Sequence, residues 1–541
     1  MDGLHQLEIV ILLLGVVLAL TTIARKLVVP YPILLVIGGL MLGLVPGVPV
    51  VTLNPDLVFL VFLPPILWAA AYFTSWRDFR YNLRPISLLA VGLVVATTAA
   101  VACVARLLLP GMGWAEAIAL GAIVSPPDAV SATAIARRLR IPRRIVTILE
   151  GESLVNDATA LVLYRVAVAA AVGGSVAFGP AISQVVFAGT AGVAIGLAVG
   201  MVTRWALSAT QDSFTEIAIT LLAPYVAWVL GEQAHASAVL ACVAGGLYLR
   251  QHFSEAVSPM TRIQGRAVWD VLVFVLNGFI FILIGLQLGA LRDAITADRW
   301  GPLLATGAVI SLTAIAVRLI WVPLAALIPR WISRTIRMRD PLPPWPNIFL
   351  IGWTGMRGIV TLAAALALPL TTSAGSPLPY RAEIILISFA VIVATLVVQG
   401  LSLAPLIRAL RLEDDHRAME REEMLAREHA AAVALTRLEE LAGESGSPAT
   451  EHVDRLRVHY NRRRQRFTNN GAVDPECAAE AVEAFRRLRH ETLTAERAAL
   501  VAMRNNDIIG DDVLHRLEHE LDIEAIRLGI GERRGGTIRP M

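Results

Sequence analysis

Long apolar segments recur through most of this chain, and they constrain its fold more than any other feature. A helix that crosses a bilayer needs about 20 mostly apolar residues, or roughly 17 to 25 when it tilts. Hydrophobic residues make up 56% of the 541 residues and charged residues only 17%, against roughly 25% charged residues in soluble proteins. The sequence therefore predicts an all-α polytopic membrane protein with thirteen spans, near residues 7–27, 33–45, 55–74, 85–109, 115–136, 145–172, 182–207, 213–231, 237–252, 266–291, 302–329, 349–371 and 382–409.

The charged residues divide the chain near Arg411. Residues 1–411 carry 27 basic and 18 acidic side chains, whereas residues 412–541 carry 20 and 26. We therefore expect a transmembrane domain over 1–411 and a helical cytoplasmic tail over 412–541. If the N-terminus lies outside, twenty basic residues fall in cytoplasmic loops and four in outer loops, as the positive-inside rule requires. This predicts a multi-pass protein of the cell inner membrane with a cytoplasmic C-terminus.

Several classes of function do not fit the residue content. The three cysteines, Cys103, Cys242 and Cys477, are too widely spaced for a Cys-based metal cage. The net charge of +3 gives no overall sign of a nucleic-acid partner, and no His-Glu-x-x-His motif is present. We expect no cofactor and no enzymatic activity, and the sequence does not identify a partner for the tail.

Ionisable residues inside membrane spans are rare and usually functional, and the sixth span has several. Helical spacing places Glu152, Ser153, Asn156 and Asp157 on one stripe. Monovalent cations such as Na⁺ prefer oxygen ligands, and this stripe supplies carboxylate, hydroxyl and amide oxygens. The pattern favours a cation site over hydrogen bonds that only hold helices together.

The fifth and twelfth spans each contain helix-breaking residues. Pro126 and Pro127 precede Asp128 in the fifth span, and two prolines remove amide donors and open the helix. The freed carbonyl of Pro127 and the carboxylate of Asp128 would then face a cavity. Three glycines surround Arg357 in the twelfth span and indicate a second broken helix. Interruptions at corresponding positions in two halves are typical of inverted-repeat transporters, with spans four to six matching spans eleven to thirteen.

Arg318 is a second cation placed deep in a span. A buried arginine is expected to pair with an acid, and Glu152 is the best candidate. Arg357 is the alternative partner for Glu152 if Arg318 is not.

At these residues the chain resembles a monovalent cation:proton antiporter of the NhaP and sodium/proton exchanger type, bacterial branch. The matching motifs are Phe62-Leu63-Pro64-Pro65-Ile66, Ser125-Pro126-Pro127-Asp128-Ala129-Val130, Glu150-Gly151-Glu152-Ser153-Leu154-Val155-Asn156-Asp157, Arg318, and Gly355-Met356-Arg357-Gly358. They run through most of residues 1–411, and the motif of the sixth span is the most specific. The tail carries no part of the match.

The resemblance implies a homodimer in which a transport bundle (about 85–172 and 302–409) moves against a dimerisation bundle (about 7–74 and 182–291). It implies that Asp157 carries the ion, that Asn156, Ser153 and Asp128 lie at or near the site, and that Glu152 pairs with Arg318. It also implies electroneutral exchange, since an Asn-Asp pair marks those members. Three positions depart from the family pattern. Pro127 replaces a frequent Thr, so only its carbonyl can be a ligand, and Ala129 replaces a frequent Pro after the acid. Ala69 stands where animal exchangers have an acid.

These observations together predict an antiporter that exchanges Na⁺ for H⁺ and contributes to pH homeostasis. One carboxylate, Asp157, can be neutralised by Na⁺ or by a proton but not by both, and only the neutralised site crosses the bilayer cheaply. Asp157, Asp128 and Ser153 are the expected Na⁺ ligands, and Asp128 is either a helper ligand or a second proton site. A K⁺/H⁺ antiporter with the same mechanism stays open. A cation channel or membrane sensor is a more remote alternative, because neither acidic rings nor pore-loop repeats are present.

Overall fold

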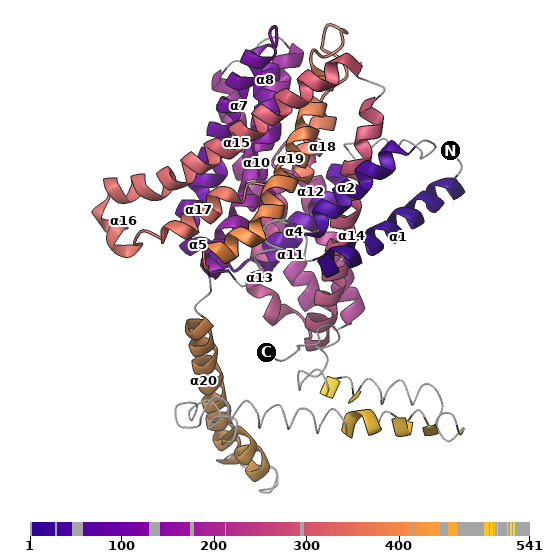
Figure 1. Ribbon diagram of the computed structural model, residues 1–541. Coiled ribbons are helices and arrows are strands. Elements are labelled where there is room, and N and C mark those ends of the chain that lie inside the picture. Colours follow the sequence, from indigo (N-terminus) through magenta and orange to yellow (C-terminus); the bar gives the residue numbers. More distant parts are fainter. Residues whose placement is uncertain are drawn as a thin grey trace. The chain divides into compact units, whose positions relative to one another are not determined.

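The computed structural model describes residues 3–27, 30–45, 58–128, 141–173, 178–210, 212–292, 297–412, 416–443, 453–461 and short runs beyond 491. The chain divides into two compact units, Met1–Asp414 and Asp415–Met541. In the first unit the helical elements are α1 (Gly3–Leu27), α2 (Tyr31–Leu44), η1 (Val58–Phe62), α4 (Leu63–Phe73), α5 (Trp76–Tyr81), α6 (Leu83–Ser87), η2 (Leu88–Leu93), α7 (Val94–Leu108), α8 (Trp114–Val124), α10 (Arg143–Gly173), α11 (Phe178–Ser208), α12 (Ser213–Gln233), α13 (Ala238–Ala256), α14 (Pro259–Arg292), α15 (Ala297–Ile332), α16 (Arg334–Arg339), α17 (Trp345–Trp353), α18 (Ile359–Leu366) and α19 (Arg381–Ala409) (Figure 1).

The described residues form helices and no strand, apart from one isolated bridge between Thr371 and Pro377. Among them, eight helices are long and apolar enough to cross a membrane, and three shorter apolar helices cover Tyr31–Gly43, Val58–Phe73 and Trp114–Val124. Many apolar side chains on the long helices are exposed, which suits contact with lipid. The prediction of an all-α polytopic membrane protein is confirmed at this level.

The twelfth predicted span differs from the observed helices at both ends. We expected it over 349–371, with the glycine-rich break near its start. Helix α17 instead begins at Trp345, with Pro344 as its N-cap residue and Pro346 in its first turn, where proline is favoured. Helix α18 ends at Leu366, three residues before Pro369, whose ring would clash with a preceding helical turn. The break therefore lies in the middle of the pair α17–α18.

Two groups of helices pack among themselves in the first unit. Helix α8 packs on α7 and α10, and α15 packs on α7, α17 and α19. In the other group α2 packs on α14, and α13 packs on α4, α11 and α12. Helix α10 also contacts α4 and α13, so it lies where the two groups meet.

A charge cluster around Asp340 joins the ends of three elements of the first group. Asp340 follows α16 and accepts hydrogen bonds from Arg84 of α6, from Arg144 of α10 (2.8 Å) and from Arg330 of α15 (2.7 Å). Partial burial raises the pKa of the Asp340 carboxyl, but the hydrogen bond and charge of Arg144 and the charges of the other two arginines outweigh it. The pKa therefore lies below its ordinary value. Three guanidinium groups on one carboxylate fix these helix ends relative to one another.

In the second unit, the longest described element is α20 (His416–Gly443). A further helical segment covers 453–461. Most of the predicted helical tail beyond residue 461 lies outside the described residues.

Candidate functional site

Two non-helical segments meet at the centre of the first group of helices. Helix α8 ends at Val124, and the backbone from Ser125 to Asp128 is not helical. Residues 354–358 separate α17 from α18 in the same way. The Asp128 backbone N–H donates a hydrogen bond of 2.7 Å to the Met356 carbonyl. The two segments predicted to interrupt their helices thus contact each other through the backbone. Ala129 and Val130 of the fifth-span motif lie outside the described residues.

Gly358 allows this close contact, and Gly355 allows a second one with Arg318. A Cβ atom at Gly358 would lie 2.7 Å from the Asp128 carboxylate, and a Cβ at Gly355 would lie 2.7 Å from Cδ of Arg318. Neither position has room for a larger side chain unless its neighbour moves. The glycines around Arg357 therefore provide space as well as interrupting the helix.

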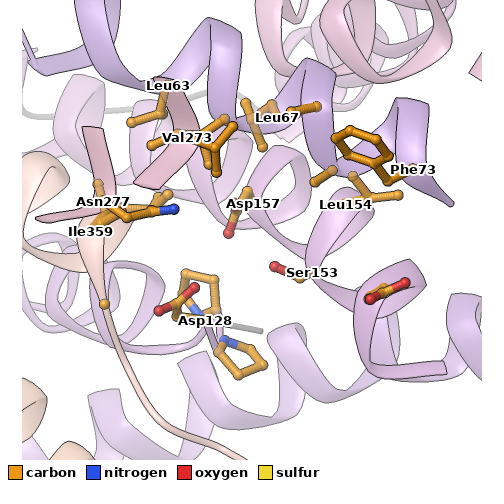
Figure 2. A pocket seen from close by; sticks show the side chains of 18 of the residues that line it. Leu63, Leu67, Phe73, Asp128, Ser153, Leu154, Asp157, Val273, Asn277 and Ile359 are labelled. Atoms are coloured by element: carbon orange, nitrogen blue, oxygen red, sulfur yellow. The ribbon is translucent and has the colours of Figure 1, made fainter. Parts of the chain in front are cut away.

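A cavity of about 300 Å³ opens beside this crossing. Figure 2 shows Asp157, Ser153 and Asp128 around one space, with their oxygen atoms directed into it. Pro127 also lines the cavity. Asp157 is 6% exposed and lies on α10, one helical turn after Ser153. Four of the predicted ion-site residues, from two separate elements, therefore line a single cavity.

Asn156 has a different environment from its neighbour Asp157. Its Nδ2 donates a 3.1 Å hydrogen bond to the Pro127 carbonyl, and it does not line the cavity. Its Oδ1 has no hydrogen-bond partner among the described residues. A carbonyl has two lone pairs, so the Pro127 oxygen can still accept a second partner. The amide of Asn156 holds the non-helical segment against α10.

Glu152 and Arg318 form a fully buried ion pair. Arg318 donates to both carboxylate oxygens of Glu152, one at 2.8 Å, and each side chain is 1% exposed. Its Nε donates a further hydrogen bond of 3.1 Å to the Ile351 carbonyl on α17. The pair joins α10, α15 and α17, and neither residue lines the cavity. The geometry is the bidentate one that makes arginine suited to buried pairs.

Arg357 is a second buried guanidinium close to this pair. It is 2% exposed, and its Nη1 donates to the Gly355 carbonyl at 2.7 Å. Its backbone N–H donates to Thr395 Oγ1 of α19 at 3.1 Å. No described acid forms an ion pair with Arg357, whereas Glu152 pairs with Arg318.

The cavity has polar lining residues that sequence reasoning did not select. Asn277 of α14 is 2% exposed, and its Oδ1 has no partner among the described residues. Tyr31, Glu150 and Asp270 also line the cavity. A signal for Asn277 was available, because it is a lone amide within an apolar run of a span. Glu150 lies inside the sixth-span motif, but the stripe that we used excluded it.

A second cavity, of about 340 Å³, lies further along α10. Ala158 and Leu161 line it, and so do Arg165 and Glu232 of α12. Arg165 Nη2 lies 2.7 Å from Glu232 Oε1, and both side chains are about half exposed. In this second cavity the acid, Glu232, is paired with an arginine, and the pair joins the two helix groups.

The sequence matches the family described as "Sodium/hydrogen exchanger, transmembrane" over residues 10–409. An uncharacterized Na(+)/H(+) exchanger of Mycobacterium tuberculosis (strain ATCC 25618 / H37Rv) is 35% identical over 97% of both chains. The "Sodium, potassium, lithium and rubidium/H(+) antiporter" of Bacillus subtilis (strain 168) is 28% identical over 97% of this chain and 80% of its own. The sodium proton antiporter MjNhaP1 from Methanocaldococcus jannaschii has a similar fold, with a TM-score of 0.59 at 18% identity over 76% of this chain and 99% of that chain.

Fold and site together define a membrane transporter of the cation/proton antiporter class. The chain belongs to the sodium/hydrogen exchanger transmembrane family, so the predicted family is confirmed. The predicted thirteen spans, dimer, orientation, ion and site residues stay predictions.

Proposed function

We propose that this protein exchanges Na⁺ for H⁺ across the cell membrane, one for one, by competition for the carboxylate of Asp157. The observation that carries the proposal is the convergence of Asp157, Asp128 and Ser153 on one cavity beside the crossing of two non-helical segments. Carboxylate, hydroxyl and carbonyl oxygens suit a hard cation. Glu152 is held by Arg318, so of the two acids on the stripe of α10 we assign to Asp157 the alternation between cation and proton.

The same reasoning extends to the architecture. We propose thirteen spans with broken helices at Ser125–Asp128 and at residues 354–358. The helix group that contains α7, α8, α10, α15 and α19 is the transport bundle. The group that contains α2, α4, α11, α12, α13 and α14 forms the dimerisation bundle of a homodimer. The N-terminus lies outside and the C-terminus in the cytoplasm, because the arginine-rich ends around Asp340 then face the cytoplasm.

Competition explains antiport by electrostatics alone. Moving a bare charge through hydrocarbon is expensive, so the bundle crosses only when Na⁺ or H⁺ neutralises Asp157. Asn156 cannot titrate, and its amide holds the Pro127 carbonyl. A cycle with one carrier acid moves no net charge. Asp128, which shares the cavity, is the residue that would raise the proton count to two if it also titrated.

The test is ion flux in proteoliposomes with an internal pH indicator. An imposed Na⁺ gradient should drive proton movement in the opposite direction. At fixed gradients, the rate should be the same at zero and at about −100 mV, a potential worth roughly 2.3 kcal/mol per charge moved. A several-fold change that follows the sign of the potential would overturn electroneutrality and implicate Asp128.

Potassium is the second candidate ion. The relative from Bacillus subtilis has sodium, potassium, lithium and rubidium in its name, and oxygen ligands accept all of these ions. The same vesicles with a K⁺ gradient separate the two: a K⁺-driven pH change as fast as the Na⁺-driven one would replace the sodium assignment with a broader one.

A further inference from the structure

A third cavity, of about 170 Å³, lies between helices of the second group. Residues of α4, α12, α13 and α14 line it. Phe73 lines both this cavity and the one that contains Asp157. The two cavities are therefore neighbours, although the proposed ion site uses only one of them.

The third cavity is positively charged. Arg250 of α13 and Arg262 and Arg266 of α14 line it, and no described acidic side chain does. Two described acids lie close by, and each has another contact. Glu216 accepts a hydrogen bond of 3.3 Å from the Ser258 backbone N–H, and Asp270 lies 3.9 Å from Arg266, at the limit of an ion pair. Three guanidinium groups around one cavity suit an anion with several oxygen atoms, such as a phosphate group.

Five aromatic residues form much of the remaining wall. Trp68, Tyr72, Phe73, Phe253 and Trp269 line the cavity. The Tyr72 ring contacts Phe253 edge-on at 5.1 Å, and the Arg250 guanidinium lies 5.8 Å from the Tyr72 ring centre. A ligand for this cavity therefore needs an apolar part next to its charge.

Helix α14 also exposes apolar side chains beside these arginines. Ile263 and Val271 are each more than 60% exposed, and they flank Arg266 in the sequence. Exposed aliphatic side chains on a membrane helix are expected to contact acyl chains. The arginines of the cavity therefore adjoin exposed aliphatic side chains that suit contact with acyl chains.

We propose that this cavity binds the phosphate headgroup of an anionic phospholipid, with Arg250, Arg262 and Arg266 on the phosphate and the aromatic wall on the glycerol and upper acyl chain. Basic pockets between membrane helices are suited to such headgroups. Free inorganic phosphate has the same charge chemistry but no apolar part to fill the aromatic wall.

Binding of the lipid also affects the proposed ion site, and this step rests on the proposed function. Arg266 lies close to Asp270, which lines the cavity of Asp157. A phosphate that engages Arg266 neutralises positive charge near that cavity and releases Asp270. The negative potential there becomes stronger, so cations are attracted. The expected result is a lower apparent KM for the cation at an unchanged maximal rate.

The first experiment measures lipid binding by the full chain in detergent, with no transport involved. Phosphatidylglycerol and phosphatidylcholine are titrated, and retained lipid is read by native mass spectrometry together with the shift in melting temperature. We expect selective retention of phosphatidylglycerol, and about a five-fold loss of affinity in R250Q and in R266Q, the factor that corresponds to about 1 kcal/mol per basic side chain. R266K should retain most of the affinity. R337Q, an exposed arginine that lines no described cavity, is the matched control and should bind like the wild type.

Three outcomes would overturn the binding site. R250Q and R266Q could retain phosphatidylglycerol as well as the wild type and R337Q do. Phosphatidylcholine could bind equally well. Inorganic phosphate in excess could displace the lipid and stabilise the protein to the same extent, which would assign the cavity to free phosphate.

The second experiment measures flux in phosphatidylcholine vesicles with and without phosphatidylglycerol. The lipid should lower the apparent KM in the wild type and in R337Q, and R266Q should lose this difference. The R337Q response measures the contribution of general surface charge. An equal KM response in R266Q would overturn the link through Asp270. Absence of flux in every lipid would count against the proposed function and leave the binding result unaffected.

Discussion

Glu152 and Asp157 lie five residues apart on α10, and both are buried, yet their surroundings differ. Glu152 is held by two hydrogen bonds from Arg318 and faces the packed helices. Asp157 faces a cavity, and no described basic side chain forms an ion pair with it. In the proposed mechanism, burial alone therefore does not make a carboxylate an ion carrier. The partner arginine would keep Glu152 in a structural role, and an acid without such a partner would be able to exchange ligands.

Replacing the unpaired acid should have the largest effect on transport. Asp157→Asn retains the side-chain volume and removes the exchangeable charge, so we expect the protein to fold and to lose both cation and proton turnover. Flux in proteoliposomes measures this, with the melting temperature as a check on folding. Glu116→Gln on α8, an acid that does not line the cavity, is the control. Antiport in D157N at a tenth or more of the wild-type rate would refute the assignment.

Breaking the paired acid should affect stability most. Removing one member of a buried ion pair leaves an uncompensated charge, at a cost of about 3–5 kcal/mol. Glu152→Ala and Arg318→Ala should each lower the free energy of unfolding or the yield by that order. The double variant should lose less than the sum, because it leaves no lone charge. Strict additivity in a double-mutant cycle would show that the pair is not coupled, and Arg357 would be tested next as the partner of Glu152.

The cluster around Asp340 tests how much an acid paired with arginines contributes to stability when it is only partly buried. Asp340→Asn should destabilise the protein by about 1.5–3 kcal/mol, since a hydrogen bond to a charged group is worth about that much. The sign of the pH dependence follows from the lowered pKa of Asp340. Its stabilisation is present above the unfolded pKa of about 3.9 and disappears as pH falls through the lower folded value. The difference in melting temperature between wild type and D340N should therefore be constant near neutral pH and shrink below about pH 4. A difference that grows as pH falls would contradict this account.

The smallest effect is expected at the other end of α10. The Arg165–Glu232 pair is about half exposed on both sides, and exposed pairs contribute about 0–1 kcal/mol. Arg165→Gln and Glu232→Gln should each change the free energy of unfolding by less than about 1 kcal/mol, and added salt should reduce that difference further. A loss of unfolding free energy as large as that of E152A would show that exposure does not determine how much each ion pair contributes to stability.

The all-helical membrane architecture could be predicted from the sequence, and the non-helical backbone at Ser125–Asp128 and at residues 354–358 falls where prolines and glycines were singled out. Apolar length and the presence of proline or glycine are local properties, so segments such as Arg381–Ala409 and the break at Ser125–Asp128 can be recognised without tertiary structure. The ends of the twelfth span were predicted less well. Prolines at 344 and 369 mark the observed limits of α17–α18, but the prediction followed the apolar run instead.

The sequence by itself determined which residues could take part in the site, because acids and amides inside a span are recognisable by their cost in lipid. Only the tertiary structure decided what each of them does. A stripe at positions i, i+3 and i+4 covers a wide face of a helix, and the neighbouring helices divide that face. Ser153 and Asp157 face the cavity, whereas Glu152 meets an arginine 166 residues away and Asn156 meets a proline carbonyl. Asn277 lines the cavity from α14 for the same reason: packing between distant segments, and not spacing along one helix, determines which side chains share a space.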